Sequence, residues 1–182
     1  MLFSFDIESI PLPSSSKRAE RVRQVWLSNA SDRKSCQFIL EQQHGSKLFD
    51  AISGNSPYLS RIIEQEADFA LWLFQNGPEK TLNNIFERLD AWPDRDVVTH
   101  EFMAFLRKEK KKAALVIAVA DITRFWSTEY IMEKLSEFAE KCISLACRHI
   151  LVRQALDGTI QLKNRQDPEI NSGYTILALC KL

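Results

Sequence analysis

The residues with the clearest chemical potential form a cluster of basic side chains in the middle of the chain. Arg107, Lys108, Lys110, Lys111 and Lys112 fall within six consecutive positions. Several cationic groups on one side of a helix would concentrate an anionic ligand or an acidic partner surface. These residues are therefore candidates for partner binding. The alternative is a solvated helix face, which is the commoner role of basic residues opposite an apolar stripe.

Cysteine and histidine are scattered in a way that does not favour a metal site. No two cysteines have C-x-x-C spacing, and no histidine belongs to an H-E-x-x-H pattern. The residues concerned are Cys36, Cys142, Cys147, Cys180, His44, His100 and His149. We expect buried thiols, with neither a metal site nor a disulfide framework.

Charge and hydropathy exclude several classes of partner. The chain has 24 Lys and Arg against 24 Asp and Glu, so no overall field attracts nucleic acid or a membrane. Nucleic-acid binding through the basic cluster is the weakest hypothesis. The longest apolar run, 113–120, is far shorter than the roughly 20 residues that cross a bilayer. Asp6 and Glu8 also stand where a secretion signal has basic residues. We expect a cytoplasmic protein with no membrane segment.

Apolar periodicity predicts that helices position these residues. Only 5 Gly and 6 Pro punctuate 182 residues, which favours a mainly α fold. A Pro- and Ser-rich start is expected to be flexible. Helices are predicted over 17–30 with Ser16 as candidate cap, over 35–43 with a stop at Gly45, and over a short segment ending at Gly54. The next helix, 58–75, follows a capped start at Asn55-Ser56-Pro57 and ends at an interruption over 76–78. Further helices are predicted over 82–89, 96–120 and 127–155.

The two longest predicted helices have distinct faces. In 96–120 an apolar stripe covers an arc of roughly 120°, and the basic cluster lies opposite. Glu109 projects into that stripe and would need a partner from a neighbouring helix. In 127–155 Ser127 is the expected cap, and the stripe is Ile131, Leu135, Phe138, Cys142 and Leu145. Burial is also expected for Trp72, Trp92 and Trp126.

The pattern changes near the C-terminus. Asp157 and Gly158 end the last helix, a polar connector covers 159–172, and 173–182 contains a continuous apolar run typical of a buried strand. The predicted fold is therefore a helical bundle (1–158) followed by one terminal β-strand. A lone strand has two unpaired edges, so we interpret it as the first strand of an α/β domain.

Three segments together resemble a known family. They are Gly-Asn-Ser-Pro-Tyr-Leu-Ser-Arg at 54–61, Ala-Ala-Leu-Val-Ile-Ala-Val-Ala-Asp-Ile at 113–122 followed by Trp126, and Gly-Tyr-Thr-Ile-Leu-Ala-Leu-Cys-Lys-Leu at 173–182. In this order and spacing they resemble the glutamate-ammonia ligase adenylyltransferases, bifunctional enzymes that add AMP to glutamine synthetase or remove it. The resemblance implies that the terminal strand begins a nucleotidyltransferase domain.

The resemblance also implies where catalysis occurs in the intact family member. There the strand leads into a Gly-Lys-(Leu/Met)-Gly turn and a Ser-Ser-Asp-x-Asp segment, whose acidic residues hold the magnesium ions that carry ATP. The present sequence stops before that segment, and Cys180 replaces a glycine of the turn. Lys181 is the one residue of the motif that is present, and it is a candidate nucleotide contact. No catalytic residue, metal ligand or cofactor is therefore expected in this chain.

Two functions follow from this resemblance. The first is a truncated N-terminal fragment of a glutamine synthetase adenylyltransferase/adenylyl-removing enzyme, inactive alone, whose relatives regulate nitrogen assimilation. Whether the chain is itself an enzyme stays open. The alternative is a helical interaction module that docks on glutamine synthetase, on the missing half of the enzyme or on a nitrogen-regulatory protein. The basic cluster and the edges of the predicted strand would provide the contacts.

Overall fold

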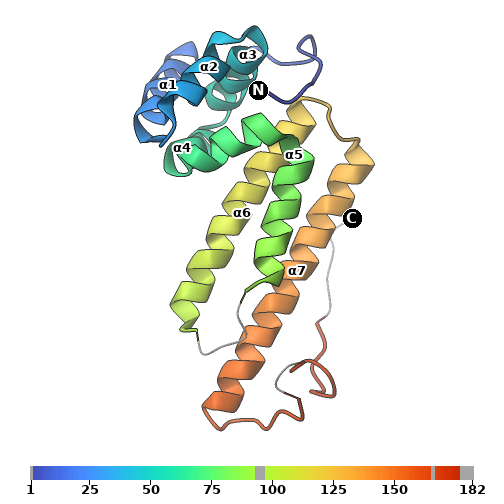
Figure 1. The fold of residues 1–182 in the computed structure, drawn as a ribbon. Helices are drawn as coiled ribbons and strands as arrows, with labels where there is room; N and C mark the ends of the chain where they lie inside the picture. The colour runs from blue at the N-terminus through green and yellow to red at the C-terminus, as the bar shows by residue number, and fades with distance from the viewer. Residues whose placement is uncertain (1, 93–96, 165–166, 177–182) are drawn as a thin grey trace.

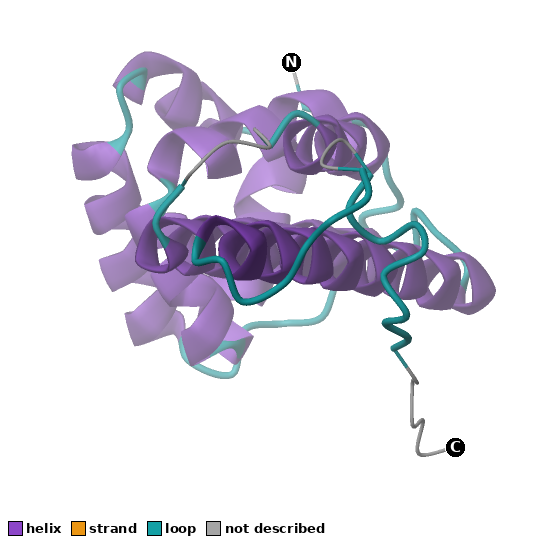
Figure 2. Ribbon diagram, turned by 90° about the horizontal axis from the view of Figure 1, so that it is seen from below, coloured by secondary structure: helices purple, strands orange, loops and turns teal. Residues whose placement is uncertain are grey.

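The computed structural model describes residues 2–92, 97–164 and 167–176, and within them it contains α-helices and no β-strand (Figures 1 and 2). The mainly α prediction is confirmed for this part of the chain. The helices are α1 (Ser16–Asn29), α2 (Arg33–Glu41), α3 (Gln43–Asn55), α4 (Pro57–Gln65), α5 (Ala67–Asp90), α6 (Thr99–Ile122) and α7 (Thr128–Leu156).

The helices form two connected groups. The short helices α1 to α4 pack together at one end, and the long helices α5, α6 and α7 lie side by side (Figure 1). Helix α4 contacts both α5 and α6, so the two groups share one core. The predicted basic cluster and the predicted stripe of the last helix therefore both lie in the long-helix group.

Side-chain caps define where several helices begin. The hydroxyls of Ser56 and Ser127 accept hydrogen bonds from the amides of Leu59 and Tyr130, as expected from their positions before α4 and α7. Ser15 caps α1 instead of the neighbouring Ser16. Each cap satisfies a backbone donor that has no partner within the helix.

Gly77 accounts for the predicted interruption near 76–78. Its φ of 80° and ψ of 170° lie in a region that is essentially restricted to glycine, and α5 bends there (Figure 1). Two other predictions about helix ends are wrong. A second break, at Glu66, divides the predicted helix 58–75 into α4 and α5. Gly45 lies within α3, where an added Cβ would collide with the carbonyl oxygen of Ile39.

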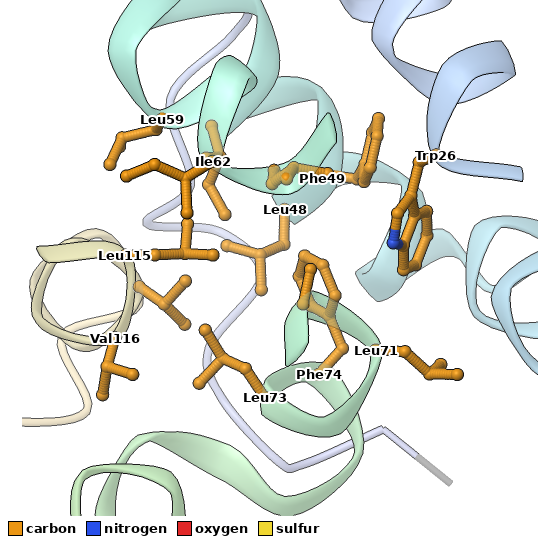
Figure 3. Close-up of a cluster of buried hydrophobic side chains, with 14 of the residues drawn as sticks. Trp26, Leu48, Phe49, Leu59, Ile62, Leu71, Leu73, Phe74, Leu115 and Val116 are labelled. Atoms are coloured by element: carbon orange, nitrogen blue, oxygen red, sulfur yellow. The ribbon is translucent and has the colours of Figure 1, made fainter. Parts of the chain in front are cut away.

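Aromatic side chains fill the centre of the short-helix group (Figure 3). The ring of Trp26 stacks on Phe49 at a centroid distance of 5.1 Å and lies 5.6 Å from Phe74. Leu115 and Val116 of α6 extend the same cluster toward the long helices. Burial of this apolar surface is the main force that joins the two groups.

The N-terminal segment is packed, so the expectation of a flexible start is wrong. Ile10 is buried, and the Phe3 amide donates a hydrogen bond to the carbonyl of Phe74 at 3.1 Å. The Ser14 amide donates to the Asn55 side chain at 2.8 Å. Apolar side chains at the start of the sequence anchor this segment, although it has no periodicity that a helix or strand would show.

The predicted terminal strand is not supported. Residues 173–176 have no regular secondary structure, and the side chains of Tyr174 and Ile176 are exposed. No second strand within the described residues is available to pair with this segment, and an isolated strand leaves its backbone groups unpaired. The remainder of the prediction, including Cys180 and Lys181, falls on 177–182 and lies outside the described residues.

Candidate functional site

A hollow of about 510 Å³ lies between α6 and α7, and we call it the α6–α7 groove. Its lining is almost entirely apolar. Helix α6 contributes Leu106, Arg107, Lys110, Ala113, Ala114 and Ile117, and helix α7 contributes Leu135, Phe138, Ala139, Cys142 and Ile143. A hollow of this size with few polar groups suits the apolar face of another helix.

Along the groove, helix α7 leaves most of its apolar side chains uncovered. Only Cys147 and Leu151 are buried along its 29 residues. Large apolar side chains on α7 are instead exposed at Met132, Leu135, Ile143, Ile150 and Leu156. The predicted stripe of this helix is therefore only partly used within the described chain, and a contiguous apolar face of this kind marks an interaction surface.

Two contacts hold α7 in place beside α5. The Glu79 carboxylate accepts hydrogen bonds from the Trp126 indole at 3.0 Å and from the Tyr130 hydroxyl at 3.2 Å. Farther along α7, the Lys141 ammonium lies 2.7 Å from the carboxylate of Asp90. Burial and the Glu79 carboxylate both raise the pKa of Tyr130, so its hydroxyl stays protonated and keeps donating at neutral pH. The groove is thus bordered by a helix that is anchored at two points.

Two residues of the predicted basic cluster contribute to the groove. Arg107 and Lys110 are exposed, and no acidic side chain in the described part of the chain lies within ion-pair distance of either. On the α7 side of the groove lies Cys142, whose thiol pKa is raised by burial. The thiol is therefore protonated and acts as an apolar wall rather than as a nucleophile. The groove offers apolar contact with a cationic edge.

The other cluster residues face a different helix. The Lys108 ammonium lies 3.4 Å from the Glu66 carboxylate, and the Lys111 ammonium donates a hydrogen bond to the Gln65 side chain at 3.1 Å. Both contacts join α6 to the C-terminal end of α4. The cluster is thus one segment of sequence whose side chains diverge, and only part of it can meet a partner at the groove.

The interpretation of the basic cluster as a solvated helix face is wrong for Lys112, because this residue is only 4% exposed. Its ammonium lies 3.6 Å from Glu109 and 3.9 Å from Glu66. Burial lowers the Lys112 pKa, and the two carboxylates oppose that shift. The side chain is occupied inside the protein and is not available to a partner.

Glu109 has the interhelical partner that its place in the apolar stripe required. It is fully buried, and the Arg88 guanidinium of α5 lies 2.7 Å from its carboxylate. Neither carboxylate oxygen has hydrogen-bond geometry with a partner, so the attraction is electrostatic. Arg88, Glu109 and Lys112 form a partly buried ion cluster between α5 and α6.

The described residues contain no group of three histidine, cysteine, aspartate or glutamate side chains that could hold a metal ion. None of the described helices combines the length and the apolar character that a membrane span requires. The predicted nucleotide contact, Lys181, lies outside the described residues.

The sequence prediction missed part of the groove. Ala139 and Ile143 line it but do not belong to the predicted stripe of the last helix. A second row of apolar residues on that helix, Met132, Ile143 and Ile150, was the signal available in the sequence. Of the expected buried tryptophans, Trp126 is buried and Trp92 is half-buried, whereas Trp72 is exposed.

Comparison with known proteins identifies similar chains. A family model described as glutamate-ammonia ligase adenylyltransferase matches residues 46–182. This range includes α4 to α7 and therefore both sides of the groove. No solved structure matches the chain significantly.

Several curated bacterial proteins match most of the chain. Each of the following relatives bears the description bifunctional glutamine synthetase adenylyltransferase/adenylyl-removing enzyme. One from Rhodopseudomonas palustris (strain BisB5) is 32% identical over 139 residues, which is 76% of this chain and 14% of the relative. One from Brucella suis biovar 1 is 27% identical over 144 residues, 79% of this chain and 15% of the relative. One from Bradyrhizobium sp. (strain BTAi1 / ATCC BAA-1182) is 26% identical over 167 residues, 91% of this chain and 17% of the relative. The match thus spans less than a fifth of each relative.

Proposed function

This chain belongs to the glutamate-ammonia ligase adenylyltransferase family, and we propose that it serves as a helical, non-catalytic portion of an enzyme that adds AMP to glutamine synthetase or removes it. Such an enzyme acts in the cytoplasm and regulates nitrogen assimilation. The family match over 46–182 carries the proposal. In it, residues 1–158 form the helical unit and 159–172 form a connector.

Magnesium and ATP belong to the chemistry implied for the intact family member. The described residues do not fit a magnesium site, since no three candidate ligands gather in them. No catalytic step is therefore assigned to these residues. Their role in the proposal is to bind.

We assign the α6–α7 groove to one occupant, a helix from the catalytic polypeptide of the same enzyme. The relatives contain more than five times as much chain as the matched portion, which provides such a neighbour. Permanent interfaces are more apolar than transient ones, and the lining of this groove is almost entirely apolar. Arg107 and Lys110 at its edge favour a helix whose apolar face is flanked by acidic residues.

A second candidate function is docking on glutamine synthetase or on a nitrogen-regulatory protein. The cationic edge of the groove favours it, because charged residues at a rim steer encounters with acidic surfaces. The relatives' description names glutamine synthetase as the protein acted on, so it is the first partner to compare. The nitrogen-regulatory protein remains the less supported of the two.

The purified chain alone is expected to neither transfer AMP to glutamine synthetase nor remove it. Turnover should appear only when the chain is mixed with a shortened form of the Rhodopseudomonas palustris BisB5 relative. In this shortened form, the segment that matches the chain has been deleted. The measurement is incorporation and release of radiolabelled AMP, with the full-length relative as the positive control. Magnesium-dependent turnover above background by this chain alone would contradict the proposed non-catalytic role.

Charge introduced into the groove is expected to prevent docking. Leu135→Asp should weaken binding of the deleted relative by at least about tenfold, because an unpaired carboxylate would be desolvated in an apolar interface. Calorimetric titration measures the dissociation constant. Leu135 is 48% exposed in the free chain, so the variant should still fold.

Phe38→Asp is the matched control for this titration. It makes the same charge change on α2, at an apolar residue that is 55% exposed and does not line the groove. It should change affinity by less than about threefold. Equal losses for both variants would argue against the groove as the docking site. Binding to glutamine synthetase but not to the deleted relative would favour the second candidate function.

A further inference from the structure

A second hollow, of about 480 Å³, lies where the first turns of α1 and α4 meet. We call it the α1–α4 pocket. Its cationic side chains are Lys17, Arg18 and Arg21 from α1 and Arg61 from α4. No acidic residue lines it. These cations are brought together by the packing of two helices whose first residues are about 40 positions apart in the sequence.

The charge of this pocket is only partly neutralised. Arg21 lies 2.8 Å from the Glu64 carboxylate, which offsets one positive charge. Arg18 donates a hydrogen bond to the backbone carbonyl of Gly54 at 3.0 Å, which fixes the guanidinium without cancelling its charge. Lys17 and Arg61 are exposed, and no carboxylate in the described part of the chain is within ion-pair distance of either. Four cations therefore meet one opposing carboxylate, in a chain whose formal net charge is zero.

The backbone adds to this positive potential. The pocket includes Ser15, which caps α1, and Pro57, the first residue of α4. Helix N-termini carry partial positive charge, and neither helix has an acidic residue in its first turn to compensate it. The side chains and both helix ends thus favour the same kind of ligand.

We propose that the α1–α4 pocket binds the phosphate group of a small molecule. The Arg61 guanidinium provides a fork-shaped pair of donors that matches phosphate oxygens, and Lys17 adds a point charge. Arg18 and Arg21 add positive charge beside their contacts with Gly54 and Glu64. The volume exceeds the need of a single phosphate, so the pocket accommodates a diphosphate. The cations surround one hollow rather than follow an extended track, which distinguishes this site from a nucleic-acid surface.

This inference does not depend on the proposed function. Lys17, Arg18 and Arg21 precede residues 46–182, the segment that matches the family, whereas Arg61 lies within it. The pocket is also formed by α1 and α4, whereas the docking groove is formed by α6 and α7. Binding of phosphate and docking of a catalytic polypeptide can therefore succeed or fail separately.

Calorimetric titration of the full chain with sodium pyrophosphate tests the proposal. Binding is expected, with an affinity that falls as sodium chloride increases because the attraction is electrostatic. Inorganic phosphate and ADP, each titrated without magnesium, distinguish a free phosphate from the phosphate tail of a nucleotide. ADP binding tighter than pyrophosphate would assign a nucleotide, and the reverse order would assign a free phosphate or diphosphate.

Charge-removing variants locate the binding site. Arg61→Gln and Lys17→Gln should each weaken pyrophosphate binding by about tenfold, since each removes a charge-assisted contact. Both residues are exposed, so neither variant should unfold the chain, and circular dichroism checks this. Lys34→Gln, on an exposed lysine of α2 outside the pocket, should leave the affinity unchanged. The absence of pyrophosphate binding up to roughly 10 mM, or equal effects of all three variants, would overturn the proposal.

Discussion

Trp26→Ala is expected to lower the free energy of unfolding by about 3–5 kcal/mol, the range seen for removing a fully buried aromatic side chain. For a chain of 182 residues this corresponds to a fall of roughly 6–20 °C in Tm. The indole has 0% exposure and lies against Phe49 and Phe74 (Figure 3). Its removal would leave a cavity at the centre of the short-helix group.

The loss should be larger than burial alone predicts, because the indole also makes a polar contact. Its N–H donates a hydrogen bond to the Ala67 carbonyl at 2.9 Å, at the start of α5. Alanine would leave that buried acceptor without this donor, which adds to the cost of the cavity. Trp26 therefore links α1 to the junction between α4 and α5.

Trp72→Ala is the matched control, because it removes the same side chain at a position that is 42% exposed. It should cost less than about 1 kcal/mol. Urea unfolding monitored by circular dichroism measures both variants, and similar m-values would show that the same transition is compared. A cost below about 1 kcal/mol for Trp26→Ala would show that the core does not depend on this ring.

Glu109→Leu is expected to lower the free energy of unfolding by about 3 kcal/mol. Breaking a buried ion pair by removing one partner leaves the other charge desolvated and uncompensated. Here the affected charge is that of Lys112, whose side chain is 5% exposed, and its other carboxylate, Glu66, is 3.9 Å away. Arg88 is much more exposed, so water can solvate it after the substitution.

The double variant Glu109→Leu/Lys112→Met distinguishes the loss of the attraction between Glu109 and Lys112 from the cost of leaving Lys112 charged and unpaired. Replacing both buried charges by apolar side chains should recover roughly half or more of the loss in Glu109→Leu. Lys108→Met, which removes an exposed cation from the same helix, should cost less than about 1 kcal/mol. Thermal unfolding of the wild type, Glu109→Leu, Lys112→Met, the double variant and Lys108→Met provides the comparison. If the double variant loses as much free energy of unfolding as the two single variants lose together, this account of the ion cluster is contradicted.

Local chemistry made several elements predictable from the sequence. The serine caps of α4 and α7, the break near Gly77 and the helical end at Gly158 depend on the preferences of residues within a few positions. The apolar stripe of α6 also predicted that Glu109 would need an interhelical partner. Its identity as Arg88 could not be predicted, because the packing of α5 against α6 determines which side chains meet.

The candidate sites were less predictable than the helices that form them. The basic cluster was visible as consecutive residues, but successive positions on a helix point in different directions. Packing against α4 and α5 therefore buries Lys112, while Arg107 and Lys110 remain at the groove. The α1–α4 pocket had no local signal at all, since Arg61 is separated from Arg21 by two intervening helices.

The sequence by itself determined that this chain is mainly helical, that serines cap α4 and α7 and which family it resembles, because each depends on local spacing or on ordered motifs. Only the tertiary structure decided which cations are buried, that the apolar face of α7 borders an open groove, and that two helix ends share a basic pocket. The physical reason is that burial and clustering arise from contacts between helices, whose side chains are brought together by packing and not by their order in the chain.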